Sequence, residues 1–190
     1  MIAQLDSALS PQEYLQWEEQ QSIRYGYVDG QVYAMTGGTI PHNQIAVNLV
    51  ALLKPYLRGK GCKVLSSDAK VGITSNGPFH YPDVSVSCDQ RDKQAREYIC
   101  HPCLIVEVLS DSTEAYDRGK KFRHYRRIQT LREYMLISQD QKSVECYRLN
   151  AQRRWELFHY IYDPDTPETN SLELTSVGLQ YTFDDLYEDV

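Results

Sequence analysis

Apolar residues return at helical intervals in the stretch that begins at Pro41. Ile45, Leu49 and Leu53 lie four positions apart, which places them on one face of a helix. Gly59 then interrupts the pattern, as glycine commonly does just past a helix end. We therefore predict a long amphipathic helix between Pro41 and Gly59.

Two other segments carry signals of a helix start. Ser10-Pro11-Gln12-Glu13 combines a capping serine, a proline at the first helical position and a glutamate three residues after the cap. This pattern predicts a helix that runs to about residue 20. Asp111-Ser112-Thr113-Glu114 repeats the capping logic and predicts a helix to about residue 128.

Short runs rich in β-branched and aromatic residues predict strands. Asp29-Gly30 separates two of these runs, 25–29 and 31–35, and is a typical hairpin turn. Leu104–Leu109 is almost continuously apolar, as in a central strand that is buried on both faces. The other predicted strands are 62–65, 69–73, 80–86, 133–137, 143–149 and 154–160, the last two forming a hairpin around Asn150, and residues 163–170 form a loop.

The chain reads as one domain, residues 1–190, because it has ordinary hydrophobic content and no repeat or linker. Its longest apolar run, 45–53, is much shorter than the roughly 20 residues of a membrane span. The N-terminal residues include Asp6 and no basic residue before an apolar block, unlike a secretory signal. We expect a cytoplasmic protein without a membrane segment.

Five cysteines are an odd number in a chain large enough to fold by packing alone. This usage predicts reduced thiols and no disulfide framework. Cys100-His101-Pro102-Cys103 has the gap of a zinc knuckle, but no second Cys/His pair at matching spacing completes four ligands. Structural cysteines are therefore expected here.

The net charge of −6 argues against a protein that coats nucleic acid nonspecifically. Residues 118–132 are an exception, with seven Lys or Arg and no acid. A solvated helix face is the ordinary explanation of such a run, and a phosphate-binding surface is the alternative.

Two carboxylates occupy unusual places in predicted strands. Asp83 follows a proline in HYPDVSVSC, where it could cap a turn, and Glu107 interrupts the buried run LIVEVL. Glu107 could pair with Arg123 or Arg126. If the two strands are adjacent, however, both carboxylates converge at one sheet edge and can hold Mg²⁺ with water molecules. Such a cation beside a lysine suits hydrolysis of a phosphodiester.

This arrangement resembles the PD-(D/E)XK nucleases, although the position two residues after the second acid is Leu109 and not lysine. The chain is more similar to one branch, the Uma-two family of restriction-type endonucleases. The matching segments are YVDGQVYAMTGG, HN at 42 and 43, YPDVSV, LIVEVLSDSTEAYDRGKKFRHY and LREYMLIS. In that family the lysine lies on the following helix, which corresponds to Lys121 here.

The resemblance implies a restriction-endonuclease-like α/β fold, with a mixed central β-sheet flanked by helices. It also implies an endonuclease that depends on Mg²⁺ or Mn²⁺ and hydrolyses DNA. Asp83, Glu107 and Lys121 would be catalytic, with the cation held by both acids and the Val108 carbonyl. The arginines expected to contact phosphates are Arg118, Arg123, Arg126 and Arg127.

Secondary candidates surround this set. Asp117 could orient Lys121, and Asp68 with Lys70 offers a second acid and amine on one strand face. His42 is expected to be neutral and hydrogen-bonded, because a helix N-terminus disfavours a cation. Tyr125 lies four residues beyond Lys121 and therefore on the same helix face.

An alternative to an active nuclease remains open. Family members often carry glutamate at two positions where this chain has Gly26 and Gln31. The chain could therefore be a nucleic-acid- or protein-binding module that keeps the nuclease fold but is catalytically impaired. The abundance of tyrosine and an edge strand favour a homo-oligomer, with a dimer the first expectation.

Overall fold

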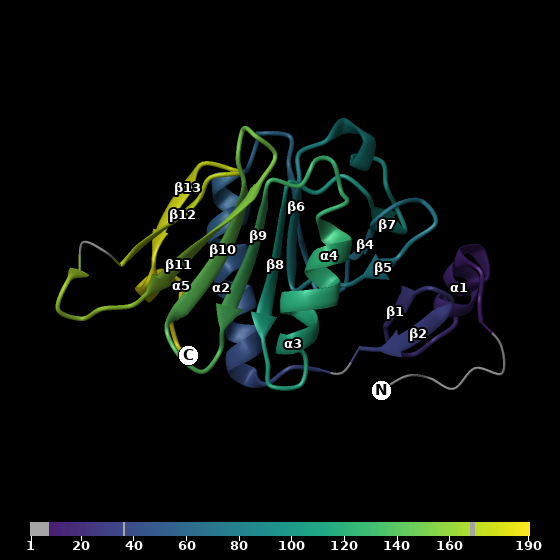
Figure 1. Cartoon of the computed structure of the whole chain (residues 1–190), viewed down its shortest axis with the longest axis horizontal. Helices are drawn as coiled ribbons and strands as arrows, with labels where there is room; N and C mark the ends of the chain where they lie inside the picture. The colour runs from purple at the N-terminus through teal and green to yellow at the C-terminus, as the bar shows by residue number, and fades with distance from the viewer. Residues whose placement is uncertain (1–7, 36, 168–169) are drawn as a thin grey trace.

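The computed structural model describes residues 8–35, 37–167 and 170–190. Its main feature is a twisted six-stranded sheet in the order β11-β10-β9-β8-β6-β3, shown in Figure 1. All neighbours pair antiparallel except β8 and β9, which are parallel. The strands are β3 (Lys63–Ser66), β6 (Val84–Ser87), β8 (Leu104–Leu109), β9 (Glu133–Ser138), β10 (Ser143–Leu149) and β11 (Trp155–Ile161).

Helices cover both faces of this sheet. The long α2 (Ile40–Tyr56) packs Ile45, Leu49 and Leu53 against one face, together with a C-terminal hairpin and a short helix. That C-terminal unit consists of β12 (Ser171–Leu174), β13 (Leu179–Thr182) and α5 (Phe183–Leu186). The opposite face carries α3 (Glu114–Tyr116), the π-helical turn η2 (Asp117–Lys121) and α4 (Phe122–Tyr125).

A second, smaller sheet lies beside the first in the order β2-β1-β5-β4-β7. Its core contains Tyr14, Tyr27 and Phe79, whose rings are stacked or tilted against each other. The elements here are α1 (Pro11–Glu18), β1 (Tyr25–Val28), β2 (Gln31–Ala34), β4 (Lys70–Gly72), β5 (Phe79–His80) and β7 (Tyr98–Ile99). The 3₁₀ turn η1 (Gln90–Asp92) follows β6, and its Asp92 accepts a hydrogen bond from Ser87.

Several local predictions are confirmed. Ser10 and Glu13 form the reciprocal capping box of α1. The β1–β2 turn has φ of 49° at Asp29 and 86° at Gly30, the left-handed conformation that the Asp-Gly pair favours. The strand predicted over 104–109 is β8, with the same limits.

The strand predicted over 80–86 is wrong in one respect that matters for the site. The chain leaves the small sheet after His80 and enters the large sheet at Val84. Pro82 lies between the two strands, and proline lacks the N–H that an inner strand needs. The break puts Asp83 at the first position before β6.

The helix predicted over 111–128 is also shorter than expected. No side-chain hydrogen bond from Thr113 caps α3, because its hydroxyl instead contacts that of Ser110. The helix widens into the π-turn η2 and α4 ends at Tyr125. Residues after 170 form the strands β12 and β13 and helix α5, none of which the sequence pattern had predicted.

The prediction of only reduced cysteines is wrong for one pair. Cys62 and Cys88 form a disulfide, with their Cα atoms 4.0 Å apart. They directly flank the last pair of the β3–β6 ladder, Lys63 and Ser87, and are therefore cross-strand neighbours. A separation of 26 residues gave no sign of this pairing. Cys100, Cys103 and Cys146 are free.

No helix in the described part of the chain is long and apolar enough to cross a membrane.

Candidate active site

Asp83, directly before β6, faces Glu107 on the neighbouring strand β8. The β6–β8 register pairs Val84 with Val106, so Asp83 is level with Glu107 at the next position along the ladder. The Glu107 side chain lies on the α3–α4 face, because the flanking Val106 and Val108 pack toward α2. The prediction that these strands are adjacent is confirmed.

The peptide backbone holds the Asp83 carboxylate in place. Its Oδ2 accepts a hydrogen bond from the N–H of Val108, 2.7 Å away on the adjacent strand. The Nε2 atom of His42, at the start of α2, lies 3.4 Å from the same oxygen. Asp83 is therefore more than a local turn cap: it joins two strands and a helix.

Glu107 is buried, at 2% exposure, and makes its contacts from both carboxylate oxygens. Oε2 is 2.8 Å from Nζ of Lys121, and Oε1 accepts a hydrogen bond of 3.1 Å from the hydroxyl of Tyr125. Its ion-pair partner is a lysine and not Arg123 or Arg126, the arginines considered from the sequence.

Lys121 is the residue whose environment departs most from the ordinary expectation. A lysine on a short surface helix is usually exposed, whereas Lys121 is 8% exposed. The Nζ atom of Lys121 also lies 3.1 Å from Oδ1 of Asp117. This contact is an ion pair whose geometry does not make a hydrogen bond. The π-turn that contains both residues is a local distortion often found at functional sites.

Charge is unbalanced in this cluster. Asp83, Glu107 and Asp117 act together on the ammonium of Lys121, so the fully ionised group has a formal charge of −2. Burial opposes the ammonium, but the three carboxylates outweigh it and raise the pKa of Lys121. Burial, with the neighbouring charges of Asp117 and Asp83, raises the pKa of Glu107 well above its usual value despite Lys121. The cluster favours uptake of a further positive charge.

His42 was expected to be neutral because of its place in the first turn of α2, but its pKa is shifted the other way. The hydrogen bond with Asp83 raises the pKa of His42, and the Val108 carbonyl and Asp117 act in the same direction, against the effect of burial. The nearby carboxylate outweighs the helix dipole because it is a full charge in direct contact. His42 thus borders the site.

The donor atoms fit a hard cation such as Mg²⁺ or Mn²⁺ in kind. Asp83, Glu107 and the Val108 carbonyl supply oxygen, the ligand that these ions prefer. No group of three His, Cys, Asp or Glu with metal-binding geometry occurs among the described residues. Backbone and water oxygens would therefore have to complete the coordination.

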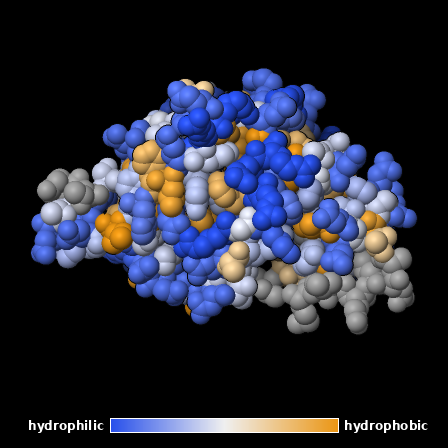
Figure 2. Space-filling model, viewed as in Figure 1, coloured by the Kyte–Doolittle hydropathy of each residue, from blue (hydrophilic) through white to orange (hydrophobic). Residues whose placement is uncertain are grey.

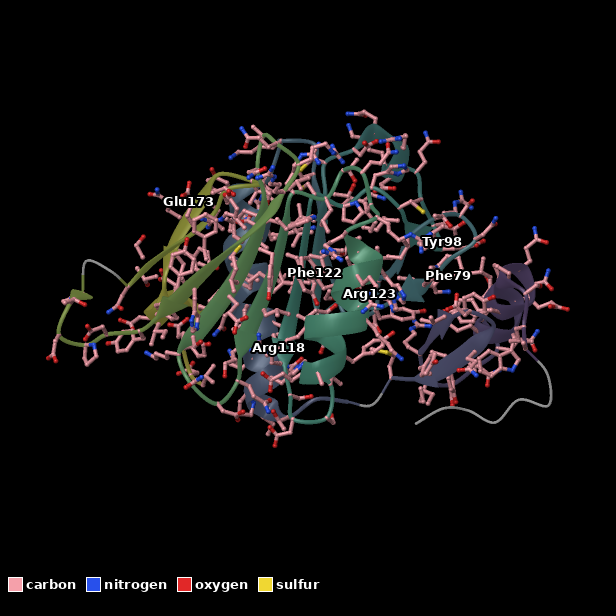
Figure 3. All side chains as sticks on the ribbon, viewed as in Figure 1. Phe79, Tyr98, Arg118, Phe122, Arg123 and Glu173 are labelled. Atoms are coloured by element: carbon pink, nitrogen blue, oxygen red, sulfur yellow. A yellow bond between two sulfur atoms is a disulfide. The ribbon has the colours of Figure 1, made fainter. Side chains whose placement is uncertain are left out.

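Other predicted residues lie elsewhere or are engaged. Lys70 pairs with Glu18 at 3.0 Å, and Asp68 faces Arg24 at 3.7 Å, so Asp68 and Lys70 do not form a second site. Arg118 forms ion pairs with Glu114 and Glu145. Figure 3 shows Arg118 beside α3 and Arg123 beside α4 on the same face of the molecule.

The basic segment forms a hydrophilic surface over α4. Arg123, Arg126 and Arg127 are exposed, and Arg126 also lies over the ring of Phe122 at 5.2 Å. Figure 2 shows strongly hydrophilic residues over this helix.

Sequence reasoning missed a histidine pair next to the site. Nε2 of His80 lies 2.9 Å from Nδ1 of His124, and the His80 ring contacts that of Tyr125. Burial, Lys121 and His124 together lower the pKa of His80 well below its usual value. The position of His80 three residues before Asp83 was the available signal, but nothing indicated the partner 44 residues later.

Comparison with known proteins agrees with this architecture. The chain is 44% identical over 191 residues to "Uncharacterized protein slr1290" of Synechocystis sp., covering 98% of this chain and 97% of the relative. It is 32% identical over 159 residues to "Uncharacterized protein sll1609" of the same organism, covering 83% and 90%.

A crystal structure described as "a putative nuclease belonging to DUF820" from Anabaena variabilis superposes with a TM-score of 0.72. The superposition covers 94% of this chain and 97% of that one, and at 18% identity it shows the shared fold. A family model, Uma2, described as "Putative restriction endonuclease", matches residues 11–184. This match spans both sheets and the Asp83–Glu107–Lys121 cluster, so the chain belongs to the Uma2 family, with the restriction-endonuclease-like fold.

Proposed function

We propose that this protein is a metal-dependent endonuclease that hydrolyses DNA phosphodiester bonds. The observation that carries the proposal is the charge of the buried cluster. Three carboxylates act on one ammonium where β6 begins and β8 ends, and a divalent cation would offset their excess negative charge. Membership of the Uma2 family supports the reaction class.

Each residue of the cluster has a distinct role in this proposal. Asp83, Glu107 and the Val108 carbonyl would hold Mg²⁺ or Mn²⁺, which when bound supplies charge stabilisation and lowers the pKa of water. The Val108 N–H fixes the Asp83 carboxylate. Lys121, whose pKa is raised, stays an ammonium and stabilises negative charge at the reacting phosphate. It does not act as a base.

Exposed arginines on α4 and directly after it provide the surface for DNA. Arg123 lies on α4, Arg126 and Arg127 follow its last residue, and all three can contact backbone phosphates. Such contacts position a substrate without reading its sequence. Arg118 is already paired with two glutamates, so its role is to fix η2 relative to β10.

A cleavage assay tests this proposal. The full chain is incubated with supercoiled plasmid and with single-stranded DNA, with Mg²⁺, with Mn²⁺ or with a chelator. We expect cleavage only with metal, and its loss in Asp83→Asn and Glu107→Gln. Asp68→Asn is the matched control, because Asp68 is an exposed aspartate outside the cluster. Equal cleavage by all four proteins would refute the assignment.

The second candidate is a binding module without turnover. It is favoured by Gly26 and Gln31 and by the burial of Glu107, both of whose oxygens already contact protein groups. Calorimetry separates the two functions. A nuclease takes up Mg²⁺ through Glu107, so Glu107→Gln lowers the affinity, whereas a binding module shows DNA binding with no metal uptake in either protein.

A further inference from the structure

We propose that the sulfur atoms of Cys62, Cys88 and Cys103 bind a zinc ion when the Cys62–Cys88 disulfide is reduced. The three residues come from separate parts of the sequence and meet where β3 and β8 begin and β6 ends. Cys88 Sγ is bonded to Cys62 Sγ and lies 4.0 Å from Cys103 Sγ. The site is distinct from the Asp83–Glu107–Lys121 cluster.

The sheet topology brings the three cysteines together. Cys62 directly precedes β3, Cys88 directly follows β6, and Cys103 directly precedes β8. Because β6 runs antiparallel to both neighbours, its end meets the beginnings of β3 and β8. Three cysteine positions therefore fall at the same end of three adjacent strands.

One sulfur–sulfur distance in the oxidised protein already suits a tetrahedral thiolate site. Zinc–sulfur bonds of about 2.3 Å place two ligand sulfurs about 3.8 Å apart in a tetrahedron. The Cys88–Cys103 distance of 4.0 Å is already close to this value. After reduction, the Cys62 and Cys88 sulfurs need only separate by side-chain rotation, because the Lys63–Ser87 pair keeps the two backbones adjacent.

The backbone of Cys103 is fixed independently of the disulfide. Its N–H donates to the Val86 carbonyl at 2.8 Å, and its own carbonyl accepts from the N–H of Arg132 and of Glu133. The thiol is half-buried, whereas Cys88 is exposed at the surface. The edge is thus rigid enough to preserve the cluster and open enough for a reductant and a metal ion to enter.

The chemistry needs a reductant, which we assign to the class of dithiols. A dithiol supplies two electrons and two protons, breaks the Cys62–Cys88 bond and is itself oxidised to a disulfide. Zinc then displaces the protons of the three thiols and binds three thiolates, with water in the fourth position.

The neighbouring Cys-X-X-Cys segment does not supply the site by itself. Cys103 is the second cysteine of this segment, but His101 is held by Asp92. The Nδ1 atom of His101 lies 3.0 Å from Oδ1 of Asp92, and the backbone N–H of His101 donates to Oδ2 of Asp92. Asp92 also accepts the N–H of Cys100. This local network orients the loop, and the ligands come from Cys62 and Cys88 on the other strands.

Metal titration of the full chain tests the proposal. The reduced protein, freed of reductant under anaerobic conditions, is titrated with Zn²⁺ by calorimetry and with Co²⁺ by absorbance. We expect one ion per chain, with a cobalt spectrum of three thiolates, and no binding by the oxidised protein. Cys103→Ser should lower zinc affinity by at least about tenfold, since even losing a group that only orients a ligand costs about 10–100-fold.

Cys100→Ser is the matched control and should bind zinc as the wild type does. Cys103→Ser keeps the disulfide, so its oxidised form reports whether the fold survives the substitution. The proposal would be overturned by equal zinc affinity in wild type and Cys103→Ser, or by loss of binding in Cys100→Ser with retention in Cys62→Ser. Exchange to a Cys88–Cys103 disulfide without zinc uptake, detected by peptide mass analysis, would overturn it as well.

Discussion

Two neighbouring lysines, Lys120 and Lys121, differ in exposure and in charged partners. Lys120 is exposed, while Lys121 is enclosed with Glu107 and Asp117. The enclosed ammonium cannot be replaced by solvent, and removing it leaves buried carboxylates without a counter-charge. The same residue type is thus a surface group at one position and part of the site at the next.

Lys121→Met should reduce DNA cleavage by about 10²–10³-fold, the usual cost of losing one group that stabilises transition-state charge. Lys120→Met, the matched control, should stay near the wild-type rate. Single-turnover cleavage at saturating Mg²⁺ measures both. Comparable losses in the two variants would show that the lysines act only through the overall charge of the helix.

His80 should make folding stability depend on pH. Burial, Lys121 and His124 lower its pKa in the folded protein below the unfolded value of about 6.5. As pH falls through 6.5, the unfolded chain binds a proton that folded His80 does not, so stability decreases toward the folded pKa. Denaturant unfolding from pH 7.5 to 5 measures this slope.

His80→Gln should flatten that slope while keeping a polar partner for His124. His159→Gln is the control, because His159 is exposed on β11 and its side chain lies against Ser143, outside the site. An unchanged slope in His80→Gln would assign the acid sensitivity to other groups.

At the scale of elements, Glu133 joins the central sheet to the C-terminal hairpin. The side chain is fully buried and pairs with Arg148 at 2.8 Å. It also accepts hydrogen bonds from the backbone and hydroxyl groups of Thr175 and Ser176, in the turn between β12 and β13. The Glu133 carboxylate thus accepts hydrogen bonds from donors of this turn that would otherwise be unpaired.

Glu133→Gln should destabilise the protein by about 2–4 kcal/mol, because it removes the charge that Arg148 and these donors share. Burial opposes ionisation of Glu133, but the bonds from Ser176, Arg148 and Cys146 outweigh it and lower its pKa below 4.5. Its contribution is therefore full above pH 4.5 and lost as pH falls through the lower folded pKa.

Denaturant unfolding at pH 7 and at low pH checks this prediction. Glu133→Gln should be less stable than the wild type at pH 7, and the two proteins should have similar stability at low pH. Glu156→Gln, an exposed glutamate on β11, is the control. A variant equally destabilised at both pH values would point to packing and not to charge.

At the scale of the whole molecule, charge is segregated although the net value is −6. Arg123, Arg126 and Arg127 are exposed together at α4 and directly after it, on the face of the sheet opposite α2, although other exposed arginines such as Arg58 lie elsewhere. A local basic surface on an acidic protein favours binding of a polyanion in one orientation.

Arg123→Ala and Arg127→Ala should each weaken DNA binding and reduce the slope of log K against log salt by about 1. Arg58→Ala, an exposed arginine just after α2, should leave the slope unchanged. Fluorescence anisotropy at several salt concentrations measures it. An equal change of slope in all three variants would indicate that DNA binds without preference for the surface around α4.

The sequence by itself determined the local elements whose signals lie within a few residues: the α1 cap, the Asp-Gly hairpin, α2 and the buried strand β8. The positions of Asp83 and Glu107 made them candidates, and the family resemblance added the fold and the choice of Lys121. The local elements are predictable because caps, turns and periodicity are short-range effects.

Only the tertiary structure decided how residues distant in sequence meet. The break at Pro82, the burial of Lys121, the His80–His124 contact and the sulfur cluster all depend on which strand ends lie side by side. Ion pairs, pKa values and disulfides are set by distances of a few ångströms between such residues, and strand order in a sheet is fixed by long-range packing that no local pattern encodes.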